Sequence, residues 1–166
     1  ELEKVEKAIE LIAAKSPEME LIRKTSITGL VRVKNVIFRS ASHPHYFGLI
    51  FLGDKISEQT VSELSISLIH EMAHQELFLI NLLDRLVHEP FDYNEVHAPF
   101  QGMKRPPIAR LHALWALYRM VQYESELGIS SDKHRNLLKQ NVAAFEEMEL
   151  TPLALKLVEI ASREAA

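Results

Sequence analysis

SISLIHEMAHQELFLINLL, residues 65–83, is the stretch that decides the fold and directs the search for a function. It contains His70, Glu71 and His74 in the pattern H-E-x-x-H, surrounded by apolar side chains. On a helix, residues four apart lie on one face about one turn apart, so both imidazoles can reach one metal ion. Glu71 lies roughly 100° around the helix from His70, where a carboxylate can reach a metal-bound water as a general base without being a ligand. We therefore expect a metal site on this helix.

A third protein ligand is needed, because two histidines alone rarely hold zinc or iron firmly. The preferred candidate is His112, in PPIARLHALWALYRM, since apolar residues on its helix face would bury it. Glu95 and His97, in a Pro-rich segment, are the alternatives. Glu95 follows His74 by 21 residues, near the spacing of the third ligand in thermolysin-like enzymes.

Two arginines flank His112 in the same part of the sequence. Arg105, His112 and Arg119 are seven residues apart, so they fall along one stripe if the helix begins early enough. A guanidinium near a metal site is suited to a carboxylate cosubstrate or an acidic substrate. A structural ion pair is the commoner role of such an arginine, and that alternative stays open.

The rest of the chain is predicted to be mostly helical, around a small N-terminal sheet. Apolar periodicity and capping signals predict helices over residues 1–14, 17–24, 57–87, 107–127, 152–161 and from Ser131 or Asp132 to 148. Runs rich in Val and Ile predict strands within 28–38 and over 46–52, separated by a turn at 43–45. The fold class is thus α+β, mostly α, with a C-terminal helical part, and we expect one metal-binding domain over 1–166.

Three of these elements carry further expectations. The helix 57–87, with Ser57 as its N-cap, is long enough that we expect a bend or a break inside it. Segment 89–107 contains four of the seven prolines and is expected to be a long ordered loop with a function. The strand from Phe47 to Leu52 would either line the cleft and pair with an extended peptide or be a core strand.

Composition excludes several classes of function. The 166 residues carry 23 acidic and 19 basic side chains, for a formal charge of −4, which argues against nucleic acid as the main partner. Eight histidines and no cysteine exclude disulfides and thiolate sites, so nitrogen and oxygen donors would hold any metal. No apolar run is long enough for a membrane helix and no signal pattern stands at the start, so we expect a cytoplasmic protein without membrane contact.

The residues of the motif resemble a known family. SLIHEMAHQELFLINLL, then HAPF, then KRPPIARLHALWAL are similar to the HExxH-motif domain of bacterial peptide-modification gene clusters, over about residues 60–120. In that family a zincin-like H-E-x-x-H is followed by an aromatic and Pro-rich loop, an Arg-Pro pair and a helix with another histidine. Some members are iron(II)- and 2-oxoglutarate-dependent enzymes that hydroxylate the β-carbon of peptide residues. The resemblance implies His70, His74 and His112 as iron ligands and Arg105 as a contact of 2-oxoglutarate.

Three hypotheses follow for the function. The leading one is an iron(II)/2-oxoglutarate-dependent hydroxylase of peptide side chains, with Glu71 orienting a ligand or water. The second is a zinc metallopeptidase in which Glu71 is the general base. The third is a non-catalytic metal-binding domain. The sequence does not indicate an oligomeric state.

Overall fold

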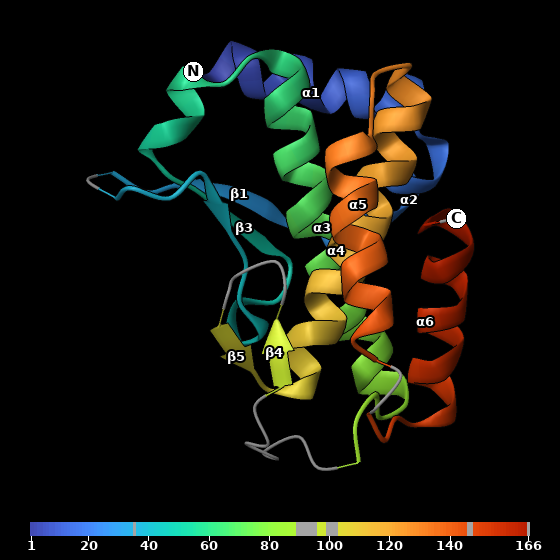
Figure 1. Ribbon diagram of the computed structural model, residues 1–166. Helices are drawn as coiled ribbons and strands as arrows, with labels where there is room; N and C mark the ends of the chain where they lie inside the picture. The colour runs from blue at the N-terminus through green and yellow to red at the C-terminus, as the bar shows by residue number, and fades with distance from the viewer. Residues whose placement is uncertain (35, 89–95, 99–102, 146–147, 166) are drawn as a thin grey trace.

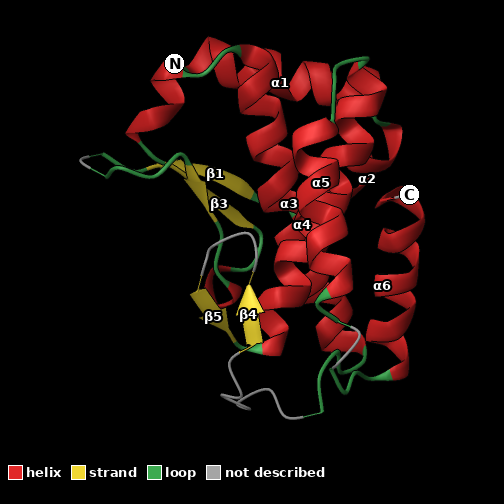
Figure 2. Ribbon diagram, in the orientation of Figure 1, coloured by secondary structure: helices red, strands yellow, loops and turns green. Residues whose placement is uncertain are grey.

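The computed structural model describes residues 1–34, 36–88, 96–98, 103–145 and 148–165, and of residues 96–98 and 103–104 it describes the backbone only. Within this part of the chain the secondary structure is mostly helical, with a small three-stranded sheet built from the first third of the sequence (Figure 1, Figure 2). The predicted class, α+β with a majority of helix, is confirmed.

Six α-helices are found in the described residues, most with ends within a few residues of the predicted ones. They are α1 (Leu2–Lys15), α2 (Pro17–Ser26), α3 (Val61–Leu83), α4 (Pro107–Leu127), α5 (Asp132–Ala143) and α6 (Pro152–Ala165). Pro107 begins α4, where a missing N–H leaves no hydrogen bond unmade, and Gly128 ends it with a φ of 70°. Helix α5 ends before the predicted residue 148, because the chain turns and buries Phe145 in the core. None of the described helices is long and apolar enough to cross a membrane.

The central strand of the sheet is β3 (Leu49–Leu52), which lies between β1 (Gly29–Arg32) and β2 (Ser40–Ala41). It runs parallel to β1 along its whole length and pairs antiparallel with β2 through Phe51 and Leu52. Alternate residues of β3 are buried against the helices. Of the two roles considered for this strand, the structure therefore favours that of a core strand. A short 3-10 turn, Pro44–Tyr46, forms where the turn between the strands was predicted.

Segment 89–107, predicted as a loop, contains an antiparallel strand pair, β4 (Val96–Ala98) and β5 (Met103–Arg105). Each strand has only three residues, too few for an alternating pattern to be recognised in the sequence. The pair lies beside the first turns of α4 (Figure 1), and β5 places Arg105 just before that helix.

Helix α3 begins after Thr60, and the prediction of Ser57 as its N-cap was wrong. The hydroxyl of Thr60 accepts a hydrogen bond from the N–H of Glu63, and the carboxylate of Glu63 accepts one from the N–H of Thr60. This reciprocal pair needs a glutamate three residues after the cap, which Thr60 has and Ser57 lacks. Ser57 lies in a 3-10 helix, Asp54–Glu58. The span predicted as one helix thus contains the end of this 3-10 helix and α3, which is one helix of 23 residues and is not broken.

Helices α3 and α4 form the centre of the molecule (Figure 1). They run antiparallel, because Phe78 contacts His112 while His70, two turns earlier on α3, contacts Met120, two turns later on α4. One hydrophobic cluster joins the first half of α3 and the last part of α4 to α1, α2 and the sheet. A second cluster joins the second half of α3 and the rest of α4 to α5 and α6. Both clusters depend on this helix pair, and the side chains of the candidate site lie between them.

Replacing Thr60 by Ala is expected to lower the free energy of unfolding by about 1 kcal/mol, because the first turn of α3 loses its side-chain acceptor. Ser57→Ala is the control and is expected to change it by less than about 0.5 kcal/mol. Urea denaturation of both variants measures the difference. A larger loss for Ser57→Ala than for Thr60→Ala would mean that the helix begins where the sequence first indicated.

Candidate functional site

Three imidazole rings meet between α3 and α4, and they are called the imidazole row below. His70 and His74, one turn apart on α3, have their Nε2 atoms 3.1 Å from each other. His112, on α4, has its Nδ1 3.2 Å from the Nδ1 of His74. All three side chains are partly buried. The structure therefore brings together the three histidines that were selected from the sequence as metal ligands.

The imidazole row is not yet a set of three converging donors. Two ligands bound at about 2.1 Å to one tetrahedral ion are about 3.4 Å apart, so the Nε2 atoms of His70 and His74 are spaced much like a ligand pair. His112 instead approaches the other ring nitrogen of His74. Among the described residues, no group of three or more His, Asp or Glu side chains is arranged to hold a metal ion. Coordination by all three histidines would require the ring of His112 to turn.

A cavity of about 650 Å³, here the first cavity, is bounded on one side by the imidazole row. Arg105 also lines it, and the Nε atom of this arginine is buried without a hydrogen-bond partner among the described residues. A guanidinium with an unused donor is suited to bind a carboxylate. The rest of the wall is partly polar and partly apolar: Ser42, His43, Pro44, Phe78, Asn81, Ile108, Ala109, Ala113 and Leu117.

Glu71 points away from the first cavity. Its side chain is only 3% exposed, and its Oε1 accepts a hydrogen bond of 2.9 Å from the hydroxyl of Ser40 on β2. It lines a second cavity of about 460 Å³, which shares His70 with the first cavity but not His74 or His112. The motif glutamate and two of the three histidines therefore lie in the walls of different cavities.

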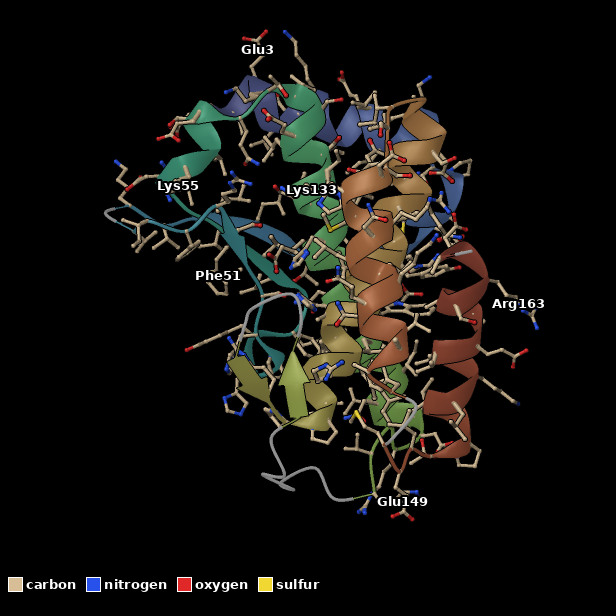
Figure 3. All side chains as sticks on the ribbon, viewed as in Figure 1. Glu3, Phe51, Lys55, Lys133, Glu149 and Arg163 are labelled. Carbon is tan, nitrogen blue, oxygen red and sulfur yellow. The ribbon has the colours of Figure 1, made fainter. Side chains whose placement is uncertain are left out.

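The second cavity contains charged groups that the sequence did not single out. His134, on α5, has its Nδ1 2.7 Å from Oε1 of Glu124 on α4. Arg39 and Lys133 line the same cavity, Lys133 from the start of α5 (Figure 3). The sequence assigns His134 no special role. The signal that could have found it is Gly128, because a sharp helix end folds the start of α5 back onto the end of α4.

Burial keeps the imidazole row uncharged at neutral pH. It lowers the pKa of His70 and of His74, and in His74 the neighbouring His70 and His112 lower it further. Burial also lowers the pKa of His112 from 6.5 to about 4. Neutral imidazoles each keep one nitrogen lone pair, which is the form that binds metal ions.

Arg119 does not join the site. Its guanidinium binds both carboxylate oxygens of Glu76 on α3, at 2.5 and 2.9 Å, and also pairs with Glu18 on α2. Trp115 donates its indole N–H to the same Glu76 carboxylate at 2.8 Å. Arg119 is 5% exposed and does not line the first cavity. Of the two roles considered for this arginine, the structure shows the ion pair.

Gln75, next to His74 in the sequence, ties α3 to the sheet and was missed by sequence reasoning. Its side-chain oxygen accepts from the N–H of Gly48 at 2.9 Å, and its amide donates to the carbonyl of Leu49 at 3.2 Å. Gly48 has a φ of 82°, which favours glycine. This tether holds the start of β3 against α3, and with it the turn before β3 that includes the cavity residue Pro44.

The two alternative third ligands are not placed by the structure. Glu95 lies outside the described residues. His97 lies in β4, where its backbone pairs with Lys104, but its side chain is outside the described part. Both therefore stay predictions beside His112.

No family model matches the chain, and no curated protein is similar to it in sequence. The resemblance to the HExxH-motif family therefore rests on the motif residues and remains a prediction. The function proposed for the chain depends on the geometry and chemistry of the site.

Replacing Arg119 by Met is expected to lower the free energy of unfolding by about 3 kcal/mol, because the Glu76 carboxylate, 16% exposed, keeps its charge and loses its partner. The control is Arg163→Met on α6, whose side chain is 75% exposed and extends away from the molecule (Figure 3). Its loss is expected to stay below about 1 kcal/mol. Equal losses in urea denaturation would contradict a structural role for the Arg119 pair.

The metal-free protein is expected to lose stability as the pH falls from 6.5 towards 4. Over that range the imidazole of His112 binds a proton in the unfolded chain, whereas burial lowers its folded pKa to about 4. The free energy of unfolding should be unaffected by this group above pH 6.5 and should fall by on the order of 2 kcal/mol between pH 7.5 and 4.5. His112→Leu should lose less over the same interval, and an equal loss in both proteins would contradict the assignment.

Proposed function

We propose that the chain is a metal-dependent enzyme whose reaction takes place in the first cavity. The observation that carries this proposal is the row of three neutral imidazoles at the wall of a cavity that also contains Arg105. His70 and His74 would hold the ion through their Nε2 atoms, which are already spaced much like a ligand pair. His112 is the preferred third ligand, with Glu95 and His97 as alternatives.

The donor set fits the metals expected from the sequence. Imidazole nitrogens suit iron(II) and zinc alike, and a chain without cysteine offers no thiolate that would favour zinc. When bound, iron(II) would supply oxygen activation coupled to the oxidation of 2-oxoglutarate, and zinc would supply a Lewis acid. The choice between them depends on what else lines the cavity.

Arg105 favours an oxygenase. Its buried Nε has no hydrogen-bond partner among the described residues, and one carboxylate of 2-oxoglutarate would accept a charge-assisted hydrogen bond from it. Phe78, Ile108 and Leu117 give the same cavity an apolar side that could receive a substrate side chain. We therefore favour an iron(II)/2-oxoglutarate-dependent hydroxylase of peptide side chains.

The position of Glu71 also favours the oxygenase over the peptidase. A general base must lie within hydrogen-bond reach of the proton that it takes. Glu71 is buried against Ser40 and lines the second cavity, so it is poorly placed for a substrate in the first. In the proposed enzyme it holds α3 against β2 and so orients His70.

The peptide substrate and the location are inferred from less direct observations. The motif residues resemble a family that acts on ribosomally made peptides, which supports a peptide as substrate. We place the reaction in the cytoplasm, a reducing compartment in which iron(II) persists.

A zinc metallopeptidase is the second candidate, because Glu71 and His70 share the second cavity and a substrate bound there would meet both. In that case the wall formed by His70 and Glu71 would be the reactive one. A non-catalytic metal-binding domain is the remaining alternative and predicts metal binding without turnover.

Protein purified without oxygen is expected to bind iron(II) and, once O2 is supplied, to convert 2-oxoglutarate and O2 to succinate and CO2, slowly in the absence of peptide. Arg105→Leu should raise the KM for 2-oxoglutarate at least about tenfold with unchanged iron content, because the carboxylate loses its charge-assisted hydrogen bond. Arg163→Leu removes an exposed guanidinium and should leave the KM unchanged.

The metal content of two further variants tests the third ligand. His112→Ala should lose the metal, whereas Glu95→Ala should keep it.

Glu71→Gln separates the two enzymes. Succinate formation should persist in this variant, whereas a peptidase that uses Glu71 as its base would lose hydrolysis by orders of magnitude while keeping its metal. A protein that binds only zinc and never forms succinate would refute the proposed hydroxylase.

A further inference from the structure

Met120, on α4, makes a polar contact with the first histidine of the motif. Its Sδ atom lies 3.4 Å from Nδ1 of His70. A thioether sulfur has no proton to donate and accepts hydrogen bonds only weakly. The contact is therefore favourable only when Nδ1 of His70 carries the ring proton.

That single restriction determines the protons of the other two rings, because a neutral imidazole has one N–H and one lone pair. With its proton on Nδ1, His70 keeps the lone pair on Nε2, so the 3.1 Å contact requires the Nε2–H of His74 as donor. His74 then keeps its lone pair on Nδ1, and the 3.2 Å contact requires the Nδ1–H of His112. The lone pair of His112 is left on Nε2.

We propose that Met120 is a positioning residue, which holds His70 in its Nδ1–H tautomer and so leaves the Nε2 lone pair of His70 for the candidate metal position. In this metal-free arrangement Nε2 of His74 carries a proton, so an ion bound by both Nε2 atoms would require the proton of His74 to move to Nδ1. Histidines that bind metals usually donate their second ring N–H to a carboxylate, a carbonyl or water, and loss of that partner weakens metal binding. Here a thioether takes the place of those acceptors. The metal-binding consequence rests on the proposed function, whereas the tautomer does not.

The surroundings of Met120 agree with this role. The residue is partly buried at the wall of the second cavity, and His70 is the histidine that both cavities share. The carboxylate of Glu71, the charged group of the motif nearest in sequence, is engaged by Ser40. Oε1 of Glu124 is engaged by His134, and its Oε2 is buried without a hydrogen-bond partner among the described residues. Among the described side chains, Met120 is the hydrogen-bond contact of Nδ1 of His70.

The test is the tautomeric state of His70 in metal-free protein at pH 7.5, measured from the nitrogen chemical shifts of ¹⁵N-histidine-labelled samples. The wild type should show His70 protonated at Nδ1. Met120→Leu, which keeps the volume but removes the acceptor, should move the proton towards Nε2. Met120→Gln should restore the Nδ1–H form, because its amide oxygen can accept the same bond although it packs less well than leucine.

Met72→Leu is the matched control. Met72 is a buried methionine within the motif and belongs to the cluster that Met120 also packs against, but Met72 lines neither the first nor the second cavity. This substitution should leave the tautomer of His70 unchanged. The proposal is overturned if His70 carries its proton on Nε2 in the wild type, if Met120→Leu leaves it on Nδ1, or if Met72→Leu shifts it equally.

Zinc titration, with zinc as a redox-inert probe, gives the second readout. Met120→Leu should bind zinc about 10- to 100-fold more weakly than the wild type, and Met120→Gln should recover most of the loss. Equal zinc affinity in the wild type and Met120→Leu would overturn the positioning role. Absence of zinc binding in the wild type, with the expected tautomers, would count against the proposed function instead.

Discussion

The antiparallel contact between α3 and α4 is the constraint on which the rest of the structure depends. The carboxylate of Glu76 on α3 binds Arg119 and Trp115 of α4, and the two side chains of this ion pair are 16% and 6% exposed. Such a pair tolerates little sliding of one helix along the other, because either partner alone would be a buried, uncompensated charge. The register that it imposes places His112 opposite His74 and Met120 opposite His70.

In that register, His70 of the imidazole row lines two cavities that differ in the side chains of their walls. The first holds Arg105 and much apolar surface, and the second holds Glu71, Glu124 and His134. His70 lines both, so any ion bound there would be reached from either side. The hydroxylation that we favour takes place in the first cavity, because Arg105, whose Nε has no hydrogen-bond partner among the described residues, lines it and Glu71 does not.

Features with a local cause could be predicted from the sequence. Pro107 and Gly128 mark the ends of α4, and the four-residue spacing of His70 and His74 predicts their common face. Features with a distant partner could not. The sequence contains nothing to say that Arg119 would bind Glu76 rather than a ligand, or that Glu71 would turn to Ser40, because both depend on which elements pack together. The cap of α3 also has a local signal, since Glu63 lies three residues after Thr60, whereas Thr60 itself lies three residues after Ser57.

The central claim is that His70 and His74 hold a single metal ion. The most direct measurement is anomalous scattering at the iron and zinc edges from crystals of protein prepared with iron(II) under exclusion of oxygen. We predict one peak at the iron edge, about 2.1 Å from Nε2 of both His70 and His74. Crystals with no anomalous peak at these two nitrogens, although iron is present in the protein, would contradict it.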